Sequence, residues 1–148
     1  MPKISYVRLM AGIDLYKEIV FGSSESAVAQ RISELEQQGK LRKIAPRLYT
    51  TNMKDSPESI VRRNLIEILV WRFPNAIISH RTAYEMRPTA SGELFLTYTQ
   101  NRRITDLPGI GVNLIKGHTA LKTAIPYMGI YISSENRWIL EVLGISRK

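Results

Sequence analysis

An amphipathic helical pattern followed at once by a short basic hairpin pattern is the feature that most constrains the fold of this chain. Residues 39–50 read Gly-Lys-Leu-Arg-Lys-Ile-Ala-Pro-Arg-Leu-Tyr-Thr, so that Pro46 and Arg47 separate two runs of strand-forming residues. A helix followed by such a hairpin is typical of a winged helix, and the charge of the hairpin favours duplex nucleic acid as the partner. Four cations within eight residues carry this charge, namely Lys40, Arg42, Lys43 and Arg47.

The composition is that of a globular protein that folds without disulfide bonds or structural metal ions. The chain has 148 residues, of which 44% are apolar, and it contains no cysteine, which excludes disulfides and thiolate metal sites. The two histidines, His80 and His118, are too few for a typical structural zinc site. We therefore expect no cofactor and no metal.

Charge and hydropathy together favour a cytoplasmic protein with an anionic partner. No apolar run reaches the roughly 20 residues that a membrane span needs, and the N-terminal residues lack the apolar core of a signal peptide. The net charge is +8, with nine Lys or Arg against six Asp or Glu in residues 1–55 and twelve against seven in the rest. The basic excess is therefore spread over both parts of the chain.

The region before the hairpin predicts three helices. Residues 3–10 and 13–20 have helical patterns, the second with Ile13, Tyr16, Ile19 and Val20 on one face. Ser23 or Ser24 can cap a third helix that ends near Gly39. The expected inward stripe of this third helix consists of Val28, Ile32 and Leu35.

The third helix is the expected recognition helix, because its outward side carries short polar groups that can approach base edges. The hairpin cations are expected to hold phosphates, and strand alternation points Arg42 to the opposite side from Lys43. Lys40 and Arg47, near the hairpin ends, are the more adaptable of the four. The residues expected to face the major groove are Ser26, Gln30 and Ser33, with Arg31 at the flank.

The remainder predicts a small mixed α/β domain after a polar linker at residues 51–55. Ser56 caps and Pro57 opens a helix to about Arg72, with Val61, Leu65, Ile68 and Leu69 on its buried face. A polar turn at residues 100–101 predicts that the strands on either side of it pair as a hairpin, until Pro108-Gly109 breaks the pairing. The expected later elements are strands at 76–79, 94–99, 102 onward, 111–115 and 129–132, and helices at 81–86 and 133–143.

Catalytic chemistry has few candidates in this sequence. His80 lies where a strand is expected to run into a helix, but no cysteine nucleophile and no evident Ser and Asp partners accompany it, which favours a local hydrogen-bonding role. Arg102 and Arg103 either bind phosphate or are solvated beside a turn. Acidic residues do not cluster at metal-ligand spacing. We expect no enzymatic activity, and an enzyme that uses His80 is the least favoured reading.

Three segments resemble one known family. Residues 39–50 resemble the wing of the AbiE-type (AbiEi-like) antitoxins, which are transcriptional autorepressors of type IV toxin–antitoxin systems. Ile78-Ser79-His80-Arg81-Thr82-Ala83 is similar to a second signature of that family, and residues 131–141 are similar to its helix after the final strand. The resemblance covers most of the chain and implies a DNA-binding repressor whose operon encodes a cognate toxin.

Similar segments also occur as N-terminal parts of larger proteins that carry a Fic domain, an AMP-transferring module. This sequence contains no Fic motif, so that kinship would make it a regulatory or DNA-binding front end to a fused catalytic domain. The stop at residues 144–148, directly after an expected helix, favours a C-terminal domain that continues in relatives.

The combined expectation is an α+β protein in two domains. Residues 1–54 form an N-terminal winged helix-turn-helix that binds double-stranded DNA, and residues 55–148 form an antitoxin-like α/β domain. The chain is a transcriptional regulator, and a homodimer on a repeated operator would multiply its affinity. The alternative is a protein-interaction module that restrains a toxin or regulates a catalytic domain.

Overall fold

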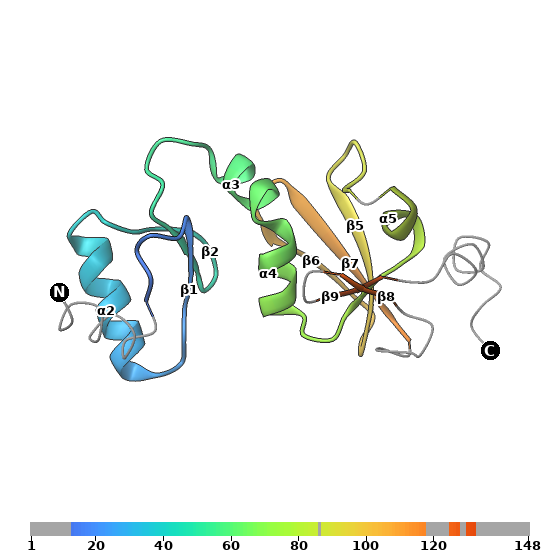
Figure 1. Ribbon diagram of the computed structural model, residues 1–148, viewed down its shortest axis with the longest axis horizontal. Coiled ribbons are helices and arrows are strands. Elements are labelled where there is room, and N and C mark those ends of the chain that lie inside the picture. Colours follow the sequence, from blue (N-terminus) through green and yellow to red (C-terminus); the bar gives the residue numbers. More distant parts are fainter. Residues whose placement is uncertain (1–12, 86, 118–124, 128–129, 133–148) are drawn as a thin grey trace. The chain divides into compact units, whose positions relative to one another are not determined.

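The computed structural model describes residues 13–85, 87–117, 125–127 and 130–132 (Figure 1). The helices expected at residues 3–10 and 133–143 lie outside these ranges. The described part is a mixed α+β protein, as expected. It divides into an N-terminal unit up to Ile60 and a C-terminal unit from Val61, and the division falls inside helix α3 (Pro57–Arg63).

The N-terminal unit is one helix packed on a three-stranded antiparallel sheet. The sheet contains the expected basic hairpin, and the hairpin strand β3 lies in the middle, between β1 and β2. Helix α2 buries Val28, Ile32 and Leu35 in a cluster with Val20 of β1, which confirms the expected inward stripe. The elements are β1 (Ile19–Phe21), α2 (Ser26–Gln37), β2 (Arg42–Ala45) and β3 (Leu48–Thr50).

The helix expected at residues 13–20 is wrong, because this segment is a turn followed by strand β1. The Asp14 carboxylate accepts a hydrogen bond from the backbone N–H of Tyr16 at 2.9 Å, which closes a local turn in place of a helical one. Tyr16 is 87% exposed, so the apparent helical face was a coincidence of spacing. Ile19 and Val20 are β-branched neighbours and pair with β3.

Helix α2 has a different start from the one expected and a well-formed end. The residue before its first turn is Glu25, whose side chain makes no cap, while the Ser23 hydroxyl accepts from the Glu25 N–H at 3.1 Å. At the other end Gly39 adopts φ 74°, and the N–H of Lys40 donates to the carbonyl of Leu35 at 2.9 Å. This left-handed glycine turns the chain directly from α2 into the hairpin.

The C-terminal unit is built on a six-stranded mixed sheet in the order β6-β7-β5-β4-β9-β8. Strands β5 and β7 are neighbours inside this sheet and pair in parallel, and their alternating residues Leu94, Leu96, Val112 and Leu114 are buried. Helix α5 contacts β5 through the Thr82 hydroxyl, which accepts from the Phe95 N–H at 2.8 Å. The elements are β4 (Ile77–Ile78), α5 (His80–Glu85), β5 (Glu93–Tyr98), β6 (Arg102–Leu107), β7 (Ile110–Lys116), β8 (Ile125–Tyr127) and β9 (Ile130–Ile132).

The hairpin expected between β5 and β6 is wrong, since β7 lies between these two strands. Strand β7 is apolar along most of its length and takes the interior position, which leaves the charged strand β6 at the edge. Pro108-Gly109 does not break a pairing but forms the β6–β7 turn, with Gly109 at φ 73°. Strand β8 was not expected from the sequence.

The long helix expected at residues 56–72 is divided in two. Helix α3 starts as expected, with the Ser56 hydroxyl accepting from the Ser59 N–H at 3.2 Å, but the chain leaves helical geometry at Asn64. Helix α4 (Leu65–Arg72) then buries Ile68 and Leu69. Asparagine competes for backbone hydrogen bonds and is a poor helix former, which accounts for the break at this position.

Candidate nucleic-acid interface

The outward face of α2 presents uncharged polar side chains, as the sequence predicted. Ser26, Gln30 and Ser33 are exposed and make no side-chain hydrogen bond within the described residues. Arg31 differs, because its guanidinium lies 3.3 Å from the Glu34 carboxylate one turn later. This face can therefore approach a surface with little loss of existing contacts.

Three of the four hairpin cations are exposed, and their side chains make no hydrogen bond or ion pair to any described residue, namely Lys40, Lys43 and Arg47. Lys43 pairs across the sheet with Tyr49, while Arg42 pairs with Thr50. Cross-strand partners share a face, so Arg42 and Lys43 point to opposite faces of the hairpin, as expected. A β-bulge between Lys43 and Ala45 then changes the register toward the turn.

Arg42 is used inside the N-terminal unit. Its Nε donates to the carbonyl of Asn52 at 2.8 Å, and one of its terminal nitrogens donates to the carbonyl of Asp55. Asn52 itself bonds the carboxylates of Glu18 and Asp55 through its amide nitrogen. The Arg42 side chain thus ties the segment after β3 to the hairpin, a role that the count of cations could not reveal.

Arg47 occupies a position that normally favours glycine or asparagine. It is the third residue of the β2–β3 turn, after Pro46, and its φ of 57° lies in the left-handed region. The carbonyl of Arg47 accepts a hydrogen bond from the Gly22 N–H at 2.7 Å, which fixes the turn against the end of β1. A Cβ on residue 22 would lie 3.1 Å from the Arg47 Cα, so only glycine allows this approach without adjustment.

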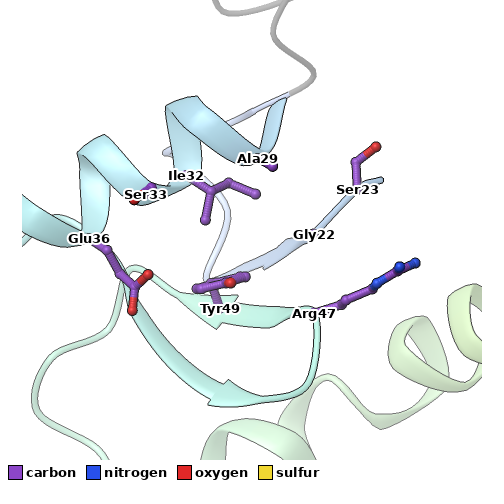
Figure 2. Close-up of a pocket in the computed structure, with 8 residues that line it drawn as sticks. All are labelled: Gly22, Ser23, Ala29, Ile32, Ser33, Glu36, Arg47 and Tyr49. Carbon is purple, nitrogen blue, oxygen red and sulfur yellow. The ribbon is translucent and has the colours of Figure 1, made fainter. Parts of the chain in front are cut away.

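A groove of about 240 Å³ separates the hairpin turn from α2 (Figure 2). Ala29, Ser33 and Glu36 line it from one stripe of the helix, and Arg47 lies at the turn. Figure 2 shows the Arg47 side chain extending away from Glu36, with Tyr49 between them. The groove brings together Ser33 and Arg47, two predicted site residues that are distant in sequence. The remaining lining residues are Gly22, Ser23, Ile32 and Tyr49.

Glu36 was not among the predicted site residues. Its signal was available in the sequence, because residues 29, 33 and 36 recur at helical spacing and therefore share a stripe. Which stripe faces the hairpin depends on how α2 packs on the sheet, and that packing is a property of the fold. Gly22 and Tyr49 could not be placed beside α2 from local patterns for the same reason.

Positive and negative side chains balance in the described part of the N-terminal unit. Residues 13–60 contain seven Lys or Arg and seven Asp or Glu. Within residues 13–60, attraction for a polyanion would therefore come from the local arrangement of the exposed hairpin cations and not from a net charge.

The polar groups of the C-terminal unit are mostly held by one another. Arg103 forms an ion pair with Glu93, whose other oxygen accepts from the Asn113 amide at 2.7 Å. These two donors hold the pKa of Glu93 below its ordinary value. Arg102 is exposed. Arg103, one of the two arginines considered for phosphate binding, is thus engaged in the sheet.

His80 stands at the start of α5 with a φ of 56°. Its Nδ1 lies 2.9 Å from the Ser79 hydroxyl, and its ring centroid lies 6.4 Å from that of Phe95. These contacts agree with a local role at the strand-to-helix junction. In the described ranges no three His, Asp or Glu side chains gather in a manner that could hold a metal ion.

No protein-family model matches this chain, and no curated protein matches it. The resemblance to AbiE-type antitoxins therefore stays a prediction from its three segments. None of the helices in the described ranges has the length and apolar content required to cross a membrane.

Proposed function

We propose that the chain binds duplex DNA through its N-terminal unit, in the manner of a winged helix, and acts as a transcriptional repressor. Helix α2 would enter the major groove, and the β2–β3 hairpin would serve as the wing along the phosphates. This activity would place the protein in the cytoplasm, without catalytic chemistry of its own. The likeness to type IV antitoxin autorepressors suggests its own operon as the target.

The observation that carries the proposal is the groove shared by α2 and the β2–β3 turn. The Gly22–Arg47 hydrogen bond holds the turn beside the polar face of α2, so that Ser33 and Arg47 line one concave surface. A left-handed conformation is costly for arginine, and such strain is typical of positions that serve a function. The arrangement places a hydroxyl of α2 and a cation of the turn along the same groove.

The proposal divides the predicted contacts into two kinds. The side chains of Lys40, Lys43 and Arg47, which have no partner within the described residues, would contact phosphates, whereas Arg42 would serve the stability of the unit. Phosphate contacts set position and salt dependence, and base-edge contacts set sequence preference. The base-edge role falls to the polar side chains of α2, Ser26, Gln30 and Ser33, with Arg31 at the flank.

The test is the salt dependence of duplex binding, measured by fluorescence anisotropy with DNA from upstream of the gene. Each phosphate contact contributes about 0.9 to the slope of log affinity against log salt. The double variant Lys43→Ala, Arg47→Ala is therefore expected to lower that slope by about 1.8. An unchanged slope would show that Lys43 and Arg47 of the hairpin do not contact phosphates. Absence of binding by the wild type at low salt would contradict the repressor model.

A matched control uses two exposed lysines at the far end of the small sheet. Lys17 and Lys54 flank the Ile19–Thr50 end of the β1–β3 pair, away from the β2–β3 turn. The variant Lys17→Ala, Lys54→Ala removes the same charge and is expected to leave the slope nearly unchanged. An equal loss in both double variants would indicate a general charge effect with no defined contact.

One observation favours the alternative of a protein-interaction module. Tyr16 is 87% exposed and Met53 is 44% exposed, and they lie in neighbouring loops, since the Thr51 hydroxyl bonds the carbonyl of Lys17 at 2.9 Å. Large exposed apolar side chains in adjacent loops are suited to a protein partner. Co-purification of a protein encoded beside this gene, lost in the variant Tyr16→Ser, Met53→Ser with DNA binding intact, would support this reading.

A further inference from the structure

We infer that Glu36 is a specificity-determining residue that accepts a hydrogen bond from the exocyclic amino group of a cytosine in the major groove. This inference rests on the proposed DNA binding and extends it to a base preference. It concerns a carboxylate that lies in the groove beside Ser33, at the opposite end from the Arg47 side chain (Figure 2).

Glu36 occupies a place where a carboxylate has little structural support. It lies in the last turn of α2, where the helix dipole disfavours negative charge and where the helix has no basic residue. The side chain is exposed, and no hydrogen bond or ion pair to a described residue engages it. Glu34, two residues earlier, is by contrast paired with Arg31.

A carboxylate next to a duplex is repelled by phosphates, so its favourable contacts are limited to amino groups of the bases. In the major groove these groups are N4 of cytosine and N6 of adenine. Adenine presents the N7 acceptor beside N6, which repels a second negative oxygen, while cytosine presents a C–H beside N4. Cytosine is therefore the base that a glutamate at this position selects.

The position of Glu36 suits this contact, because it shares a stripe with Ser33, a predicted base-reading residue. Residues three apart on a helix are neighbours on its surface, so the two side chains would meet adjacent base pairs. The groove between this stripe and the β2–β3 turn leaves the stripe open to a base edge. Arg47 reaches out from the turn and would keep the phosphates at the far end of the groove from the carboxylate.

The experiment uses the full chain and a pool of duplexes with a randomised core of about 20 base pairs, which covers two helical turns. The wild type and Glu36→Gln each select sequences from this pool. We expect the wild type to require cytosine at one position, at which any other base lowers affinity about tenfold. Glutamine pairs with adenine N6 and N7, so Glu36→Gln is expected to lose the cytosine preference there and to gain affinity for adenine.

Glu25→Gln is the matched control, because it removes the same charge directly before the same helix, outside the groove, from an exposed side chain that makes no cap hydrogen bond. The control is expected to bind every duplex somewhat more tightly by the same factor, whereas Glu36→Gln should lose affinity for the cytosine duplex relative to the other duplexes. If the two variants alter all duplexes by the same factor, the base contact does not exist. If the wild type selects no sequence at all, the proposed sequence-specific DNA binding is refuted, and the role inferred for Glu36 is refuted with it. Circular dichroism of each variant checks that α2 is intact.

Discussion

Replacement of Arg47 by glycine separates two effects of this residue: the strain of its left-handed conformation and its proposed contact with a DNA phosphate. Its φ of 57° is a conformation that L-amino acids rarely adopt and that glycine adopts freely. Because the carbonyl of Arg47 already bonds Gly22, the turn keeps this geometry whatever side chain it carries. Arg47→Gly should therefore stabilise the N-terminal unit while it weakens DNA binding.

The magnitude follows from two opposing terms. A non-glycine residue in the left-handed region costs about 1–2 kcal/mol, and this cost disappears in Arg47→Gly. Glycine also gives the unfolded chain more conformational freedom, which lowers the free energy of unfolding by about 0.4–1 kcal/mol. The expected net gain is about 0.5–1 kcal/mol, since the exposed Arg47 side chain has no partner among the described residues that would be lost.

Hydrogen exchange is the suitable assay, because the chain has two units and a single melting curve would combine them. Slowly exchanging amides of α2 and β3 should be protected about two- to fivefold more in Arg47→Gly than in the wild type. Arg47→Ala keeps the strain and should match the wild type in protection. In DNA binding, the salt slope should be about 0.9 smaller for Arg47→Gly and for Arg47→Ala than for the wild type. Arg47→Lys keeps the charge and should have nearly the slope of the wild type.

The reasoning is refuted if Arg47→Gly exchanges faster than the wild type, because the left-handed turn would then not be a source of strain. It is also refuted if affinity for DNA follows protection across the three variants. In that case the arginine would act through the stability of the hairpin, and no phosphate contact would be needed to explain its effect.

Two further predictions concern side chains that hold the fold. Arg42→Ala removes two hydrogen bonds from a charged donor to the carbonyls of Asn52 and Asp55. It should lower the stability of the N-terminal unit, measured by exchange of its amides, by about 1.5–3 kcal/mol and leave the salt slope of DNA binding unchanged. A variant with unchanged stability and a reduced salt slope would instead indicate that Arg42 contacts DNA. Glu93 has a lowered pKa, so its charged form stabilises the C-terminal unit above the ordinary value of 4.5, and this contribution is lost as pH falls through the folded pKa. We therefore expect the free energy of unfolding, measured with urea and tryptophan fluorescence, to fall less steeply below about pH 4.5 in Glu93→Gln than in the wild type. If the free energy of unfolding falls equally steeply with pH in both proteins, the carboxylate has no such role.

The sequence was sufficient where one local pattern decided the structure. The stripe of Val28, Ile32 and Leu35, the left-handed Gly39 and the two runs of strand-forming residues predicted α2 and the hairpin correctly. It failed at residues 13–20, where four apolar residues matched a helical period but Asp14 closed a turn. Periodicity over so few residues does not distinguish a helix from a turn followed by a short strand.

Strand order in the C-terminal unit could not be read from neighbouring segments. Sequential strands usually pair, which favoured β5 with β6, but the sheet places the more apolar β7 between them. The candidate site had the same difficulty at a smaller scale. Arg42 and Lys43 are adjacent cations in the sequence, and only their cross-strand partners show that one holds a loop while the other faces solvent.

The balance of charge in residues 13–60 bears on how tightly the proposed repressor could bind DNA. Three cations whose side chains have no partner among the described residues, Lys40, Lys43 and Arg47, would give one unit a salt slope of only about 2.7, well below that of proteins with six to ten phosphate contacts. Because residues 13–60 have no net charge, the other side chains of that segment add little attraction. Two copies on a repeated operator would double the number of contacts and make the second binding step intramolecular. With so few phosphate contacts in each copy, base contacts such as those proposed for Ser33 and Glu36 would account for a larger share of the affinity.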